Sequence, residues 1–148
     1  MKTTKKTLTF ALVLAALLCL LVLSAGAYSG TRYGDTDIYY SVNGNNEAVI
    51  TDAKSSIEAA DIPEVINGHT VTAIEGFAFK DCTSLSSVTI PKSVTRIGSS
   101  AFFGCTSLLS ITIPENVTSI GDHAFRDCSA LSRINWNAES VTDFLQYN

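Results

Sequence analysis

Positive charge is scarce in this sequence. Its 148 residues include 10 Lys and Arg against 14 Asp and Glu, and three of the lysines lie close to the N-terminus. Without those three, 7 basic residues remain, and the net charge falls from −4 to −7. Proteins that bind nucleic acid carry clustered Lys and Arg that neutralise the phosphates. We therefore expect no nucleic-acid partner.

Motifs that carry catalytic or metal chemistry are also missing. The sequence has no Gly-x-Ser-x-Gly turn, no phosphate-binding loop and no metal-ligand spacing. Its two histidines, His69 and His123, stand in unrelated contexts, which favours exposed loop residues. Asp81 and Asp127 occupy equivalent positions in the repeats described below, but Gly104 stands at that position between them. Solvated loop charges explain both acids, so we expect no enzyme, cofactor or metal site.

The N-terminal segment has the pattern of a secretory signal peptide over residues 1–27. Three lysines precede an apolar run, Leu8–Leu23, and Ala25-Gly26-Ala27 supplies the small residues that a signal peptidase requires. We expect cleavage after Ala27. The alternative is an uncleaved anchor, because Leu8–Ala27 is just long enough to span a bilayer. Either way, the basic residues stay inside and the rest of the chain is exported, to the cell surface or beyond.

Residues 28–61 predict a β-rich N-terminal cap. Two strand-like runs, 38–42 and 48–50, flank Asn43-Gly44-Asn45-Asn46. Asn-Gly between such runs is a strong hairpin signal. A stack of repeats needs such a cap, because its first unit would otherwise expose an apolar end and an unpaired strand edge.

A motif, Ala-Phe-x-x-Cys-x-x-Leu, occurs three times at a spacing of 23 residues. It starts at Ala78, Ala101 and Ala124. A strict repeat of this length predicts a solenoid, in which each coil buries its apolar face only against its neighbours. We expect about three coils over residues 62–136, followed by a truncated C-terminal cap at 137–148.

Each coil should combine one short strand with several bends. A Leu-x-x-Val/Ile-x-Ile/Trp segment closes each motif, and its alternation predicts a strand. Pro91 and Pro114 follow two of these strands and end them, because proline donates no hydrogen bond. Gly98 and Gly121 are expected to permit a tight bend, and the Ala-Phe segment to form one short helical turn. The predicted fold class is therefore α/β and rich in β-structure.

The complete unit resembles the BspA-like, or treponemal-type, leucine-rich repeat. The resemblance rests on Ile-Pro-x-x-Val-Thr-x-Ile-Gly-x-x-Ala-Phe-x-x-Cys-x-x-Leu-x-x-Ile-x-Ile, which residues 90–113 and 113–136 match nearly throughout. It implies an exported or surface protein of the leucine-rich repeat class. Members of this family are connected with adhesion and with binding of host proteins, so the resemblance also implies an adhesion-type role.

Three cysteines, Cys82, Cys105 and Cys128, share one repeat position and should stack along the solenoid. Neighbouring coils lie about 4.7–4.9 Å apart, so the outer two would be about 10 Å apart, too far to share one zinc ion. The flanking Phe and Leu predict an apolar site, where free cysteine packs as a small hydrophobe. One disulfide between neighbouring coils is the alternative, because the usual Cα separation reaches about 6.8 Å.

The strands leave one set of side chains pointing to solvent: Ser87, Thr89, Ser110, Thr112, Arg133 and Asn135. They form a candidate ligand face, as on the concave side of many solenoids. Alternatively, Ser and Thr stand there only because they are favourable in exposed strands. Three strands of four residues give about 200 Å², well below the ~800 Å² per partner of a standard protein interface. Such a face alone should bind weakly.

Together these features predict a secreted or surface-exposed, non-enzymatic binding module for an extracellular protein or glycan. Contact with a membrane is expected only through an uncleaved signal segment. The alternative is a structural or assembly protein that associates with itself through the solenoid ends.

Overall fold

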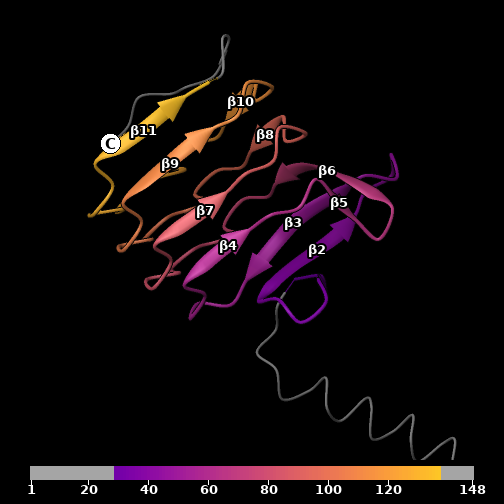
Figure 1. The fold of residues 1–148 in the computed structure, drawn as a ribbon, viewed down its shortest axis with the longest axis horizontal. Helices are drawn as coiled ribbons and strands as arrows, with labels where there is room; N and C mark the ends of the chain where they lie inside the picture. Colours follow the sequence, from indigo (N-terminus) through magenta and orange to yellow (C-terminus); the bar gives the residue numbers. More distant parts are fainter. Residues whose placement is uncertain (1–28, 138–148) are drawn as a thin grey trace, which may run out of the picture.

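The computed structural model describes residues 29–137. The chain winds into stacked coils behind an N-terminal hairpin, and strands of successive coils run side by side (Figure 1). The strands are β1 (Thr31–Arg32), β2 (Ile38–Val42), β3 (Ala48–Ala53), β4 (Ala59–Asp61), β5 (Val65–Ile66), β6 (His69–Ile74), β7 (Ser87–Thr89), β8 (Arg96–Ile97), β9 (Ser110–Ile113), β10 (Ser119–Ile120) and β11 (Arg133–Trp136). Residues 29–137 contain no helix, and so none long and apolar enough to cross a membrane. The predicted signal segment, 1–27, and all of the predicted C-terminal cap except Asn137 lie outside the described residues.

The predicted N-terminal hairpin is confirmed. Strands β2 and β3 pair antiparallel on either side of Asn43-Gly44, and β1 pairs with the other edge of β2. On its far side β3 pairs in parallel with β6, where Ile50 lies opposite Ile74. Strand β3 thereby covers the edge that the first coil would otherwise expose.

The coils build strands on two sides. One side is a continuous sheet in the order β1-β2-β3-β6-β8-β10, with β5 attached to β6. The other side carries β4, β7, β9 and β11, which pair in parallel as β4–β7 and β9–β11. Strand β4 lies inside the segment predicted as cap, yet Ala59–Asp61 pairs residue for residue with Ser87–Thr89. The strand side therefore has four coils rather than about three, and it begins before the predicted boundary at residue 62.

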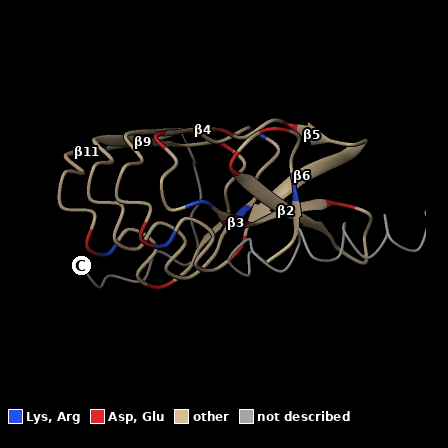
Figure 2. Ribbon diagram, turned by 90° about the horizontal axis from the view of Figure 1, so that it is seen from below, with Lys and Arg blue, Asp and Glu red and all other residues tan. Residues whose placement is uncertain are grey.

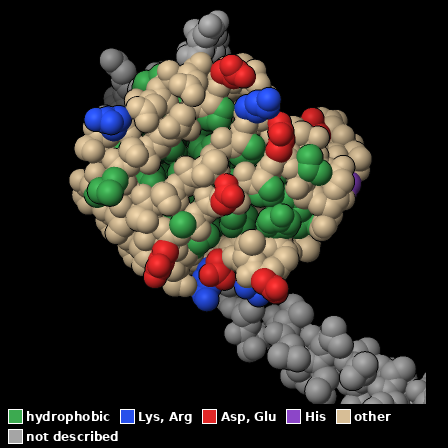
Figure 3. All heavy atoms as spheres, viewed as in Figure 1, with side chains coloured by type: hydrophobic (Ala, Val, Ile, Leu, Met, Phe, Trp, Pro, Cys, Tyr) green, Lys and Arg blue, Asp and Glu red, His purple; other side chains and the backbone are tan. Residues whose placement is uncertain are grey.

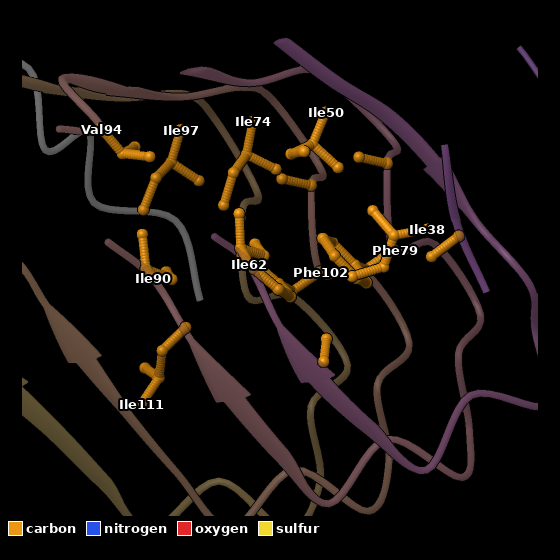
Figure 4. Close-up of a cluster of buried hydrophobic side chains, with 14 of the residues drawn as sticks. Ile38, Ile50, Ile62, Ile74, Phe79, Ile90, Val94, Ile97, Phe102 and Ile111 are labelled. Atoms are coloured by element: carbon orange, nitrogen blue, oxygen red, sulfur yellow. The ribbon is translucent and has the colours of Figure 1, made fainter. Parts of the chain in front are cut away.

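Apolar side chains from both sides fill the interior of the coils. In Figure 4, Ile74 and Ile97 face Ile62 and Ile90 across this core, and all four are buried. Phenylalanines of the Ala-Phe turns stack along the solenoid axis: the Phe79 and Phe102 ring centroids are 5.0 Å apart, and those of Phe102 and Phe125 are 5.6 Å apart. The 23-residue period thus reflects a core that repeats from coil to coil.

The Ala-Phe turns form without a helix, and the expectation of one short helical turn was wrong. Alternate amides of the first turn donate to the next coil instead: those of Phe77, Phe79 and Asp81 form bonds of 3.1, 2.7 and 2.8 Å. Two residues of this turn have left-handed φ, 64° at Phe77 and 57° at Asp81, and their equivalents in the other turns share this conformation. A helix would keep φ negative and satisfy its amides internally. The described fold is therefore β-rich.

Gly98 and Gly121 are required for space rather than for a special bend. Neither has a left-handed φ. A Cβ on Gly98 would lie 2.6 Å from the carbonyl carbon of Glu75, and a Cβ on Gly121 would lie 2.7 Å from Cα of Ser99. Glycine thus lets the backbones of successive coils touch. Glu75 takes this position in the coil that follows β3, where its amide bonds the Ile50 carbonyl at 2.8 Å.

Candidate functional site

The outward side chains of β4, β7, β9 and β11 form one surface, the strand face. All six residues predicted for it are exposed: Ser87, Thr89, Ser110, Thr112, Arg133 and Asn135. Parallel pairing places Thr112 beside Asn135, and the Asn135 amide donates to the Thr112 hydroxyl at 3.4 Å. Figure 3 shows this side of the molecule, where uncharged polar and hydrophobic groups predominate in the middle and most charged side chains lie towards the rim.

Strand β4 extends the strand face by two residues that the sequence analysis missed. Ala59 lies beside Ser87, and Asp61 lies beside Thr89; both added residues are exposed. A signal for them exists in the sequence, because Ile62-Pro63 matches Ile90-Pro91 and implies an equivalent strand before it. The extension brings one acidic group to the strand face.

Leu109 interrupts the polar pattern between β7 and β9. The equivalent residues, Ser86 and Ser132, each donate two hydrogen bonds to the preceding coil. The Ser132 amide and hydroxyl donate to the Leu109 carbonyl at 3.0 and 3.2 Å. The Ser86 amide and hydroxyl donate to the Glu58 carbonyl in the same way. Leu109 has no hydroxyl for this role, and its side chain is 60% exposed. It adds an apolar group to the otherwise polar edge of the strand face.

A hollow of about 290 Å³ lies where the strands of the strand face end. It is lined by Ile90, Lys92, Thr112, Pro114, Glu115 and Asn137. Lys92 and Glu115 are exposed, and neither forms an ion pair within the part of the chain that the structure describes. Their charged groups are therefore available to a ligand. Thr112 belongs to both the hollow and the strand face, so the two are continuous.

The three repeat cysteines are buried free thiols. The Cys105 Sγ donates to the Phe79 carbonyl at 3.1 Å, and the Cys128 Sγ donates to the Phe102 carbonyl at 3.0 Å, in each case one coil back. Contact with the Cys128 thiol and burial raise the pKa of Cys105 well above its usual range. Burial, with the nearby Asp52 and Asp81 charges, raises the pKa of Cys82 to about 12. Contact with the Cys105 thiol shifts the pKa of Cys128 downward instead. Cys82 and Cys105 are thus held protonated, and because buried, protonated thiols are poor nucleophiles, the geometry of these two suits packing.

The histidines do not converge with the acids of the Ala-Phe turns. Both histidines were expected as exposed loop residues, but His69 begins β6 and both are half-buried. His69 Nδ1 lies 3.0 Å from the Asn46 carbonyl, whereas His123 lies in the third Ala-Phe turn. Asp81 and Asp127 are exposed, and each lies about 4 Å from the basic residue before it. In Figure 2, acidic and basic residues likewise lie next to one another on several of the loops. Among residues 29–137 no group of His, Cys, Asp and Glu could hold a metal ion.

Solved leucine-rich repeat proteins share this fold. One from Bacteroides ovatus is 27% identical, with a TM-score of 0.62 over 69% of this chain and 28% of that protein. One from Eubacterium ventriosum is 26% identical, with a TM-score of 0.57 over 72% of this chain and 28% of that protein. One from Bacteroides capillosus is 26% identical, with a TM-score of 0.52 over 70% of this chain and 96% of that protein. The chain thus spans less than a third of the first two.

The repeats themselves match a family model. The model describes the BspA type leucine rich repeat region, in 6 copies, and it matches residues 53–147. Its start lies before β4, in agreement with a first coil that includes this strand. No curated protein matches the chain. Because the family match covers well over half of the sequence, the chain belongs to the BspA-type leucine-rich repeat family.

Proposed function

We propose that this chain is an exported, non-enzymatic binding module whose strand face, with the adjoining hollow, holds a small epitope of an extracellular protein or glycan. The observation that carries this proposal is the continuity of the two features at Thr112. A flat strand surface alone offers few contacts, and the open hollow at its end adds contacts to the side of a ligand.

The size of this site favours a small epitope. The four strands have three or four residues each and give about 220 Å² of strand face, which is about a quarter of the ~800 Å² per partner in a standard protein interface. The hollow, at about 290 Å³, is close to the ~300 Å³ lower limit of small-ligand pockets. One sugar unit or one short peptide segment fits these dimensions better than a folded domain. Useful avidity then requires several copies of the module or of the epitope.

The chemistry of the site favours a ligand rich in hydrogen-bonding groups. Thr89 and Thr112 present hydroxyls that both donate and accept. Lys92 and Glu115 add one donor group and one acceptor group at the hollow, and Ile90 and Pro114 supply its apolar wall. Sugar hydroxyls and peptide amides match this combination. An extracellular site of action is supported by the signal-like segment at 1–27 and by the family.

The test begins with a screen of the exported protein, produced from the full chain, on arrays of glycans and cell-surface proteins. Thr89→Arg plus Thr112→Arg places two bulky cations on the strand face without touching the core. We expect this double variant to keep the wild-type circular dichroism spectrum and melting temperature and to lose ligand binding.

The matched control is Thr95→Arg plus Thr118→Arg. These threonines are also exposed and 23 residues apart, but they lie next to β8 and β10, on the other sheet. Their hydroxyls donate to the preceding coil at 3.2 and 3.3 Å, so the melting temperature of the control is measured with its binding. The control should bind as the wild type does. If the Thr89 and Thr112 double variant keeps its fold and still binds the ligand, the strand face is not the binding site.

A further inference from the structure

Phe77 is an exposed aromatic residue in an unfavourable backbone conformation. Its φ is 64° and its side chain is 58% exposed. A left-handed φ is unusual for a bulky residue and costs about 1–3 kcal/mol. The equivalent positions in the next two turns hold Ser100 and His123, with φ of 56° and 58°. The fold thus needs the conformation but not the phenyl ring, which gains little from burial here.

Phe103, on the adjacent turn, is a second aromatic departure from the repeat, although it has no left-handed φ and is half-buried. Lys80 and Arg126 occupy its position in the neighbouring coils, and both are exposed. The next residue, Gly104, replaces an aspartate, and a Cβ there would lie 2.5 Å from Oδ1 of Asp81. Glycine therefore leaves room for the Asp81 carboxylate beside Phe103. Two aromatic residues and one glycine replace the usual polar residues within a single small area.

Lys80 links the two aromatic rings. Its Nζ lies 5.7 Å from the Phe77 centroid and 6.0 Å from the Phe103 centroid, so the two rings can be no farther apart than these distances combined. Asp81 Oδ2 lies 4.0 Å from the same Nζ, and the side chains of Lys80 and Asp81 are 48% and 60% exposed. We call these four residues, Phe77, Lys80, Asp81 and Phe103, the aromatic patch.

We infer that the aromatic patch is a second binding site, separate from the strand face, for a neutral carbohydrate. One side of a pyranose ring presents polarised C–H groups, which pack on the electron-rich face of an aromatic ring. Its hydroxyls need hydrogen-bond donors and acceptors at the rim, which the Lys80 ammonium and the Asp81 carboxylate supply. All three turns share the left-handed conformation, so only the exposed phenyl ring of Phe77 is left to serve ligand contact rather than stability.

Other classes of partner fit the aromatic patch less well. A polyanionic ligand would meet Asp81 and the nearby Asp127 on a chain that is itself acidic. A protein partner would need ~800 Å², and the other large exposed apolar residues, Val42, Val65, Leu109 and Trp136, belong to strands or their edges rather than to these turns. A small cation is disfavoured, because the positive charge of the Lys80 ammonium near both rings would repel it, whereas a neutral sugar meets no such repulsion.

The test uses the exported protein made from the full chain and short neutral oligosaccharides of glucose, galactose and mannose, titrated one at a time. Phe77→Ser and Phe103→Lys introduce the residues of neighbouring repeats. Phe77→Ser should melt at or above the wild-type temperature, because its ring is exposed, and Phe103→Lys, which removes a half-buried ring, should keep the wild-type circular dichroism spectrum. We expect each to weaken binding of the recognised sugar by about tenfold, the size of one aromatic contact. Phe77→Trp should keep binding, and its tryptophan emission should shift as the sugar is added.

The matched control is Leu109→Ser, which also replaces an exposed apolar residue with the serine of its neighbours. It lies at the strand face and should leave sugar binding at the aromatic patch unchanged, as should Thr89→Arg plus Thr112→Arg. Loss of binding at the strand face and loss of binding at the aromatic patch are thus measured with different variants. The inference is overturned if no oligosaccharide binds the protein or shifts the Phe77→Trp emission. It is also overturned if Phe77→Ser and Phe103→Lys bind the sugar as the wild type does, or if the aromatic patch binds anionic vesicles or peptides instead.

Discussion

Replacement of Gly98 by alanine should destabilise the solenoid strongly, although the change adds one methyl group. The new Cβ would lie 2.6 Å from the carbonyl carbon of Glu75, and the amide nitrogen of Gly76 would be closer still. Backbone cannot move aside as a flexible side chain can. The two coils must therefore separate locally by about 1 Å to reach ordinary van der Waals contact.

The cost follows from what holds these coils together at that point. Overpacking in a tight site costs about 1–3 kcal/mol. The Gly98 amide bonds the Ile74 carbonyl at 2.8 Å, and the Phe77 amide bonds the Ser99 carbonyl at 3.1 Å. Weakening both adds about 1 kcal/mol for each bond. The expected loss is about 3–5 kcal/mol, or a decrease of about 12–20 °C in melting temperature for a domain of this size.

Thermal unfolding followed by circular dichroism measures this effect, with Gly44→Ala as the matched control. Gly44 lies in the β2–β3 turn, has no left-handed φ, and has open space where a Cβ would point. The control should melt within about 2 °C of the wild type, because surface changes of this kind cost less than about 0.5 kcal/mol. If Gly98→Ala melts as the control does, close contact of the coils is not the reason for the glycine.

Two further predictions concern the stacked core. Phe102→Ala should lower the free energy of unfolding by about 3–5 kcal/mol. Phe125→Ala should lower it by clearly less, because Phe102 is fully buried between two rings whereas Phe125 is partly exposed. Equal losses in urea unfolding would contradict this. Burial raises the pKa of Cys82 from an ordinary 9.0 to about 12, so between these pH values the thiol ionises in the unfolded chain but not in the folded protein. The free energy of unfolding should therefore fall by about 1.4 kcal/mol per pH unit as the pH rises from 9 towards 12. Cys82→Ala should remove this part of the slope, and parallel pH curves for the two proteins would refute it.

The sequence was sufficient to predict the stacked architecture because core positions recur with little variation. A solenoid coil has no core of its own, so the same inward residues must return at each 23-residue step. The hairpin at Asn43-Gly44 was equally predictable, because its turn depends on local conformational preference. The hydroxyl-bearing positions of β7 and β9 followed from strand alternation alone.

Other features depend on contacts between coils, which a single repeat does not reveal. The Ala-Phe segment has local spacing compatible with a helical turn, but its amides bond the next coil, as Phe79 does with Ala101 at 2.7 Å. Strand β4 precedes the first Ala-Phe motif, so its membership in the stack becomes clear only from pairing with β7. The hollow is formed by residues of successive bends, and no motif in one bend predicts it.

At the outward positions of this solenoid, a residue that differs from its repeat equivalents changes the stability of the fold by different amounts. Arg133 and Asn135 replace serine and threonine at exposed strand positions, where the change has little energetic consequence, so drift alone explains them. Phe77 replaces serine or histidine at a left-handed position and leaves a phenyl ring 58% exposed. Departures that cost stability are expected mainly at functional or strained sites. Drift therefore explains the exposed Phe77 ring less readily than the polar changes on the strands, and this difference is the structural ground for proposing a second site at the turns.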